Sequence, residues 1–226
     1  MATNLKAKSI KTATIKTTSM KIVETKPAFW DEAIAYLSAK DPFMKSMAER
    51  AGTQCLTSRG QPFETLLRSI TGQQISVKAA DSVWARVLAC IVDTTPAAVL
   101  ERTTEELRAC GLSGRKVEYL QSLSHAFNDG TVNPAGWAAK DDEALIKELI
   151  QVKGIGRWTA EMVLMFNALR PDVFAVDDVG LQNALKANYG LHTKAEWIAQ
   201  AGLWAPYRSV ASWLLWRSLD PIAVAY

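Results

Sequence analysis

The chain has 226 residues, of which 49% are hydrophobic, and its formal net charge is +3. This length and composition are sufficient for a packed core in one large or two small domains, and the mean hydropathy is −0.01. No apolar run approaches the roughly 18 residues that a membrane-spanning helix requires, so no membrane association is expected. The N-terminus lacks the apolar segment of a secretory signal.

The positive charge is concentrated in residues 1–26, which contain six lysines and one glutamate. We expect these residues to form a flexible basic tail before a folded domain over 27–226. Weak attraction to phosphates, a solubilising role and a transit peptide remain open for the tail, although the segment contains no arginine. The other 200 residues carry 20 basic and 22 acidic side chains, so charge alone does not indicate nucleic-acid binding.

Cysteine and histidine residues are few and far apart. Cys55, Cys90, Cys110, His125 and His192 show no spacing typical of metal ligands. We therefore expect no metal held by these side chains and a reducing compartment, which is the cytoplasm of a bacterium or the nucleus of a eukaryote.

From Pro27 onward the apolar residues follow a helical spacing almost throughout. Pro27, with Asp31 and Glu32 close behind it, indicates the start of a helix. The run 62–91 predicts two helices joined by a tight turn near Thr71 and Gly72. Further helices are expected over 96–110, 115–128, 141–151, 157–169, 179–189, 194–202 and 206–219. The β-prone run 173–176 is only four residues long, so we predict an all-α fold of two lobes.

A turn with two glycines separates the predicted helices 141–151 and 157–169. Gly154 and Gly156 permit a hairpin with unusual backbone angles, and a new helix starts near Arg157. Such a turn leaves backbone N–H groups free at the helix start, where they and the helix dipole favour an anion such as a DNA phosphate. A plain helix–helix turn is the alternative interpretation, because glycine commonly ends helices.

Two adjacent acids, Asp177 and Asp178, open the helix predicted over 179–189. One aspartate at this place is explained by capping of the helix N-terminus. The second acid is not needed for capping. A carboxylate near a helix N-terminus is held ionised by the dipole, which is the state that stabilises positive charge on a substrate.

Taken together, these features resemble the helix-hairpin-helix DNA glycosylases, and within them the 3-methyladenine DNA glycosylase II branch, over residues 62–220. The resemblance lies in Gly-Ile-Gly-Arg-Trp-Thr-Ala at 154–160, the aspartate pair, Trp-Ala-Pro-Tyr-Arg-Ser at 204–209, Trp216, Ile-Thr-Gly-Gln-Gln-Ile-Ser at 70–76 and Gly-Leu-Ser-Gly-Arg-Lys at 111–116. The resemblance implies that Asp178 is the catalytic carboxylate and that Asp177 is its neighbour or a cap. Trp158 and Trp216, with Asp177 beside them, would line the pocket for the base.

The same resemblance implies the DNA-binding residues. Gln74, with Gln73 beside it, corresponds to the wedge that fills the gap left by a flipped nucleotide. The wedge is apolar in the related 3-methyladenine DNA glycosylase II sequence, so the polar Gln74 is a departure. The expected hairpin contacts to DNA are Gly154, Gly156, Arg157 and Thr159. The expected ligands of a Na⁺ or K⁺ ion in the hairpin are the backbone carbonyls of Ile150, Val152 and Ile155.

The implied activity is removal of alkylated purines, of the 3-methyladenine and 7-methylguanine type, from double-stranded DNA by a monomeric enzyme. Trp158 stands where family members with lyase activity carry a lysine, so no Schiff base is expected. No cysteine follows Cys110, so no iron–sulfur cluster is expected. A glycosylase for deaminated or oxidised purines, a non-catalytic DNA-binding module and a helical protein-binding scaffold remain alternatives, but the last two leave Asp178 unexplained.

Overall fold

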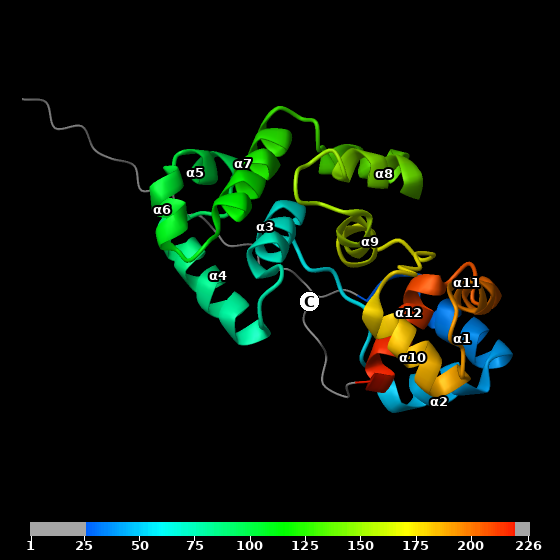
Figure 1. The fold of residues 1–226 in the computed structure, drawn as a ribbon. Coiled ribbons are helices and arrows are strands. Elements are labelled where there is room, and N and C mark those ends of the chain that lie inside the picture. The colour runs from blue at the N-terminus through cyan, green and yellow to red at the C-terminus, as the bar shows by residue number, and fades with distance from the viewer. Residues whose placement is uncertain (1–25, 220–226) are drawn as a thin grey trace, which may run out of the picture.

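The computed structural model describes residues 26–219, and within this range the chain is helical with no strand (Figure 1). The predicted all-α fold is thereby confirmed, and the run 173–176 forms no strand. The predicted basic tail lies outside the described residues, apart from Lys26, which pairs with Asp31. None of the described helices has the length and apolar character needed to cross a membrane.

The described helices have the following bounds. They are α1 Trp30–Lys40, α2 Pro42–Ala51, α3 Pro62–Gly72, α4 Val77–Ile91, α5 Pro96–Leu100, α6 Thr104–Ala109, α7 Gly114–Asn128, the 3₁₀ helix η1 Pro134–Ala139, α8 Asp142–Leu149, α9 Arg157–Phe166, α10 Val179–Tyr189, α11 Lys194–Leu203 and α12 Arg208–Leu219.

The helices form two groups that the chain connects twice (Figure 1). The first group contains α3 to α9, and the second contains α1, α2 and α10 to α12. The segment 52–61 leads from α2 into the first group, and the segment 167–178 leads from α9 back to α10. The segment 167–178 thus joins α9 of the first group to α10 of the second group. The predicted aspartate pair, Asp177 and Asp178, lies at the end of this segment, directly before α10.

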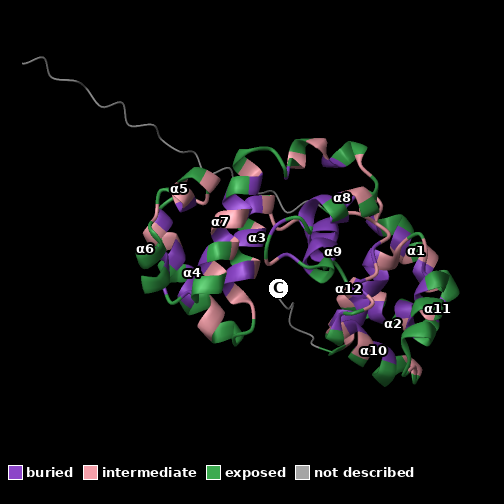
Figure 2. Ribbon diagram, turned by 45° about the horizontal axis from the view of Figure 1, so that its top comes forward, coloured by how far each residue is buried: buried purple, intermediate pink, exposed green. Residues whose placement is uncertain are grey.

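Helix α9 is buried on all sides over most of its length. All residues from 159 to 166 are buried, whereas α3 buries one face only (Figure 2). A helix that is apolar on all sides is stable only when neighbours cover it all round. Helices α3 and α8 both pack on α9.

Three expected elements differ from the structure. The helix expected to start at Pro27 begins at Trp30. The run 96–110 was expected as one helix but forms α5 and α6, because Thr103 and Glu106 make a capping box that starts a second helix. Helix α9 ends at Phe166, three residues before the expected end, and Leu169 has a left-handed φ of 51° that no helix accommodates.

Candidate active site

Asp178 caps α10 and is almost entirely buried. Its Oδ1 accepts the backbone N–H of Leu181 over 2.8 Å, and the residue is 6% exposed. The cap of α10 is therefore Asp178 and not its neighbour Asp177. The positive end of the helix dipole faces the carboxylate and favours negative charge there.

Two indole groups complete the surroundings of this carboxylate. Trp158 of α9 donates its Nε1–H to Oδ2 of Asp178 over 2.8 Å, and Trp216 of α12 donates its Nε1–H to Oδ1 over 2.9 Å. Three donors thus converge on Asp178, which suits an ionised carboxylate because that form only accepts hydrogen bonds. The structure brings together Asp178, Trp158 and Trp216, which the resemblance assigned to the catalytic carboxylate and the base pocket.

The two tryptophans differ in their access to solvent. Trp216 is 6% exposed, whereas Trp158 is 37% exposed and lies at the start of α9. An exposed large aromatic side chain beside a buried carboxylate is the feature expected of a binding pocket wall.

Gly180 and Phe166 also shape the site, although neither was predicted from the sequence. A Cβ at position 180 would lie 3.0 Å from Oδ1 of Asp178 and 3.0 Å from Cδ1 of Trp216. Phe166 stacks on Trp216 with a centroid distance of 5.9 Å, and the Arg59 guanidinium lies 4.1 Å from the centroid of the Phe166 ring. A glycine in the first turn of a helix was the available signal, since helices otherwise disfavour glycine.

Asp177 points to a different contact. Its side chain is 66% exposed and pairs with Lys194 of α11 over 2.7 Å. Asp177 was expected beside the substrate pocket, but its carboxylate instead forms an exposed ion pair with Lys194.

The predicted hairpin lies between α8 and α9. Gly154 has a φ of 85°, and a Cβ there would lie 2.2 Å from the ring of Tyr119, so only glycine fits. Gly156 is the N-cap of α9 and provides no side-chain cap, which leaves the first N–H groups of α9 without that partner. Free N–H groups at an N-terminus form a site for an anion.

The two other hairpin residues assigned to DNA differ in position. The side chain of Arg157 is 54% exposed and pairs with Glu143 and Glu161, and the hydrogen bond with Glu143 raises its pKa. Thr159 is 7% exposed, so its side chain is buried in the packing of α9. The structure leaves Arg157 at the surface of the hairpin and places the Thr159 side chain inside.

The residues expected to form the wedge, Gln73 and Gln74, lie in the connection between α3 and α4. Gln74 is exposed and has a left-handed φ of 58°. Gln73 is half-buried, and its side-chain amide donates to the carbonyl of Gly154 over 3.0 Å. This hydrogen bond joins the wedge connection to the hairpin across 81 residues of sequence.

The expected cation ligands belong to one short turn. The carbonyl of Val152 accepts the N–H of Ile155 over 3.1 Å, and Ile150 is the C-cap of α8. Neutral carbonyl oxygens suit a monovalent cation, so this donor set fits Na⁺ or K⁺. Among residues 26–219 no group of three or more His, Cys, Asp or Glu side chains could hold a metal ion.

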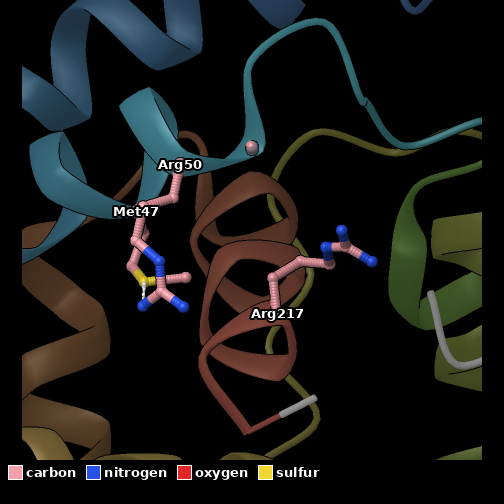
Figure 3. A pocket seen from close by; sticks show the side chains of 4 residues that line it. Met47, Arg50 and Arg217 are labelled. Carbon is pink, nitrogen blue, oxygen red and sulfur yellow. Dashed lines mark hydrogen bonds between the residues drawn. The ribbon is translucent and has the colours of Figure 1, made fainter. Parts of the chain in front are cut away.

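A small hollow between α2 and α12 is separate from this site (Figure 3). It is lined by Met47, Arg50, Ala51 and Arg217. Figure 3 shows the side chains of Arg50 and Arg217 extending on different sides of α12, so their charges do not converge on one ligand.

Comparison with known proteins agrees with the fold. Residues 67–208 match the model of the HhH-GPD superfamily base excision DNA repair proteins. DNA-3-methyladenine glycosylase 1 of Schizosaccharomyces pombe is 32% identical over 83% of this chain and 86% of its own.

Two solved structures are similar over most of the chain. The 3-methyladenine DNA glycosylase Mag1 of S. pombe in complex with abasic DNA is 32% identical, with a TM-score of 0.74 over 85% of this chain and 98% of that chain. A DNA-3-methyladenine glycosidase of Bacillus halodurans is 32% identical, with a TM-score of 0.76 over 90% of this chain and 94% of that chain. The chain belongs to the HhH-GPD superfamily of base excision DNA repair proteins.

Proposed function

We propose that this protein is a DNA glycosylase that hydrolyses the N-glycosidic bond of alkylated purines, such as 3-methyladenine and 7-methylguanine, in double-stranded DNA. The similar proteins named above are 3-methyladenine glycosylases, and one of them was solved with abasic DNA. The observation that carries the proposal for this chain is the buried Asp178 carboxylate between the indole N–H groups of Trp158 and Trp216.

The chemistry follows from these three side chains. An enzyme that acts on a base must first move the nucleotide out of the stack, at a cost of a few kcal/mol that is smallest for a damaged base. An alkylated purine is cationic, and an aromatic face attracts a cation by about 0.5–2 kcal/mol. Trp158, which is partly exposed, is the wall at which such a base is received.

Asp178 acts on the sugar. The cationic base is a good leaving group, so bond cleavage needs no strong general acid. The bond breaks through an oxocarbenium-like state, which Asp178 stabilises through its negative charge while it orients or deprotonates the attacking water. The products are the free base and an abasic site.

DNA is held by local features, since the body of the protein has no excess of basic side chains. The free N–H groups at the start of α9 would receive one backbone phosphate. A Na⁺ or K⁺ ion on the carbonyls of Ile150, Val152 and Ile155 would supply positive charge beside the same phosphate. Gln74, exposed at the tip of its connection, would fill the gap in the stack.

The enzyme is proposed to be monofunctional and monomeric. A lyase step requires an amine that forms a Schiff base with the sugar. The position that approaches Asp178 from α9 is occupied by the indole of Trp158, which cannot form one. Borohydride treatment during turnover is therefore expected to trap no covalent complex. The proposed monomeric state has a separate reason, which is that flipping of one nucleotide requires only one subunit.

The deciding experiment is single-turnover release of 7-methylguanine and 3-methyladenine from duplex DNA by the wild type, Asp178→Asn and the matched control Asp177→Asn. Asparagine keeps the cap of α10 but removes the charge, so the rate should fall about a hundredfold or more while DNA affinity is retained. The control should match the wild type, because Asp177 contacts Lys194.

Other outcomes would reject parts of the proposal. Release of hypoxanthine or 8-oxoguanine in place of the alkylated bases would reassign the substrate. DNA binding without release of any base would indicate a binding module. Equal release by Asp178→Asn and the wild type would remove the catalytic role from Asp178.

A further inference from the structure

The connection between α3 and α4 holds its exposed tip in a conformation that its own sequence disfavours. Helix α3 ends at Gly72, Gln73 follows as its C-cap, and Gln74 has a φ of 58°. A residue with a side chain adopts this left-handed conformation at an energetic cost, and it persists only where surrounding contacts enforce it. The contacts that enforce it must therefore come from residues next to Gln74.

Gln73 provides one such contact. Its Nε2 donates to the carbonyl of Gly154 over 3.0 Å, although the two residues are 81 positions apart. Gly154 is itself fixed, because its φ is 85° and its Cα lies against the ring of Tyr119. The acceptor of the Gln73 amide is thus a rigid point of the hairpin.

Helix α7 provides a second contact, to the end of α3, from the face that also carries Tyr119. Lys116 Nζ donates to the carbonyl of Thr71 in the last turn of α3 over 2.8 Å, and Tyr119 lies one turn further along α7 against Gly154. Burial lowers the pKa of Lys116. One face of α7 thereby contacts both the end of α3 and the hairpin, and the Gln73 amide joins those two segments directly.

We infer that Gln73 is a positioning residue: its hydrogen bond to the hairpin carbonyl of Gly154 sets the place of Gln74 relative to the hairpin, and Gln73 itself does not enter the DNA. This inference rests on the proposed function, since it assumes that Gln74 fills the gap left by the flipped nucleotide. It departs from the sequence-based expectation that Gln73 is a DNA contact beside Gln74. A fixed distance between the phosphate site of the hairpin and the wedge would align both with one strand of DNA.

The test is a double-mutant cycle of Gln73→Met and Gln74→Ala. Methionine keeps the length of glutamine but donates no hydrogen bond. The measurements are single-turnover base release and the fluorescence of 2-aminopurine placed beside the lesion, which rises on flipping. Loss of one neutral hydrogen bond in Gln73→Met should lower the rate of base release about fivefold, and the rise in 2-aminopurine fluorescence by a similar factor. The matched control is Gln61→Met, at the exposed start of α3, where the side chain makes no capping bond.

If Gln73 acts through Gln74, the double variant is no slower than Gln74→Ala alone. Additive losses would mean that Gln73 has an effect of its own and would overturn the inference, as would wild-type behaviour of Gln73→Met. Thermal unfolding of all variants separates these effects from loss of folding.

A second measurement does not depend on base release. The side-chain NH₂ resonances of Gln73 should keep their position when duplex DNA with an abasic analogue is added, because the bond to Gly154 persists. Movement of these resonances to the region of an unbonded amide would show that Gln73 leaves the hairpin and would overturn the inference. Absence of base release by the wild type, with unmoved Gln73 resonances, would reject the proposed function and leave the positioning role supported.

Discussion

Trp216 donates its indole N–H to Oδ1 of Asp178, and the same oxygen accepts the backbone N–H of Leu181. Oδ1 therefore has two donors within 2.9 Å, whereas Oδ2 has the indole of Trp158 over 2.8 Å. Trp158, the partner of Oδ2, is partly exposed, whereas Trp216, the partner of Oδ1, is buried. If the protein acts as proposed above, Trp216 fixes the carboxylate and Trp158 faces the substrate.

Removing the Trp216 hydrogen bond should therefore slow the chemical step. Trp216→Phe keeps an aromatic ring against Phe166 but has no N–H, and a hydrogen bond to a charged group contributes about 1.5–3 kcal/mol. We expect single-turnover base release to fall at least about tenfold, with little change in affinity for undamaged DNA. The control is Trp213→Phe on the same helix, where the ring packs on Trp30. An equal loss in the control would attribute the effect to packing of α12.

Gly180→Ala tests the close approach of α10 to the site. The added Cβ would lie 3.0 Å from Oδ1 of Asp178 and from Cδ1 of Trp216, so at least one of the two must shift. Misplacement of a reacting group by about 1 Å can cost about a hundredfold in rate, and since the shift needed here is smaller, we expect a loss of up to about tenfold. Denaturant unfolding should change by less than about 1 kcal/mol, since alanine also favours the helix.

The matched control for Gly180→Ala is Gly202→Ala in α11, where an added Cβ meets nothing within 4 Å. This variant should retain full activity and gain stability through the higher helix propensity of alanine. Wild-type rates for Gly180→Ala would show that Asp178 and Trp216 can adjust without cost.

The sequence predicted those features that depend on local pattern. Apolar spacing and turn residues predicted most helices, because burial of one helix face imposes a period of 3.6 residues. Even the break between α5 and α6 had a local signal, the Thr103 and Glu106 capping box, which the apolar spacing concealed. The aspartate pair was found as a helix start, although which of Asp177 and Asp178 is the cap depends on backbone geometry.

The sequence could not predict contacts between segments that only the fold brings together. The Gln73 bond to Gly154 spans 81 positions, and neither residue type indicates the other. The roles of Trp158 and Trp216 came from the resemblance to a family, because tryptophan is most often a packing residue. Gly180 stands out as a glycine at the start of a helix, but the sequence does not show that Asp178 and Trp216 are the groups that approach it.

The hairpin should not tolerate a side chain at Gly154. Gly154→Ala combines a φ of 85° with a Cβ 2.2 Å from Tyr119, so we expect a loss of about 1–3 kcal/mol in the free energy of unfolding and weaker DNA binding. Urea titration and fluorescence anisotropy with duplex DNA measure the two effects. In Tyr119→Ala/Gly154→Ala the clash is removed but the backbone strain remains, so recovery should be partial.

Gly156→Ala is the control within the same hairpin. A Cβ added at Gly156 meets nothing within 4 Å. The φ of Gly156 is −93°, which any residue adopts. Its stability should stay close to that of the wild type. A comparable loss of stability in Gly156→Ala would show that the hairpin rejects any substitution and that Tyr119 is not the cause.

Acid should destabilise the protein through Glu148 of α8, which is 6% exposed. Burial alone would raise the pKa of Glu148, but Lys140, the N–H of Asn133 and the indole of Trp137 all donate to it and hold its pKa below the usual 4.5. A carboxyl group with a lowered pKa in the folded state stabilises the fold above about pH 4.5, and this stabilisation is lost as the pH falls through the lowered value.

Glu148→Gln removes the titrating group and keeps its shape. At pH 7 the variant should be less stable than the wild type by about 1–3 kcal/mol, because three donors lose a charged acceptor. Urea titrations between pH 7 and pH 3 should show this difference shrinking below pH 4.5, as the wild type takes up its proton. Glu105→Gln, at an exposed position of α6, is the control and should follow the wild type at every pH. A difference for Glu148→Gln that stays constant down to pH 3 would mean that the loss comes from packing and not from the ionised carboxylate.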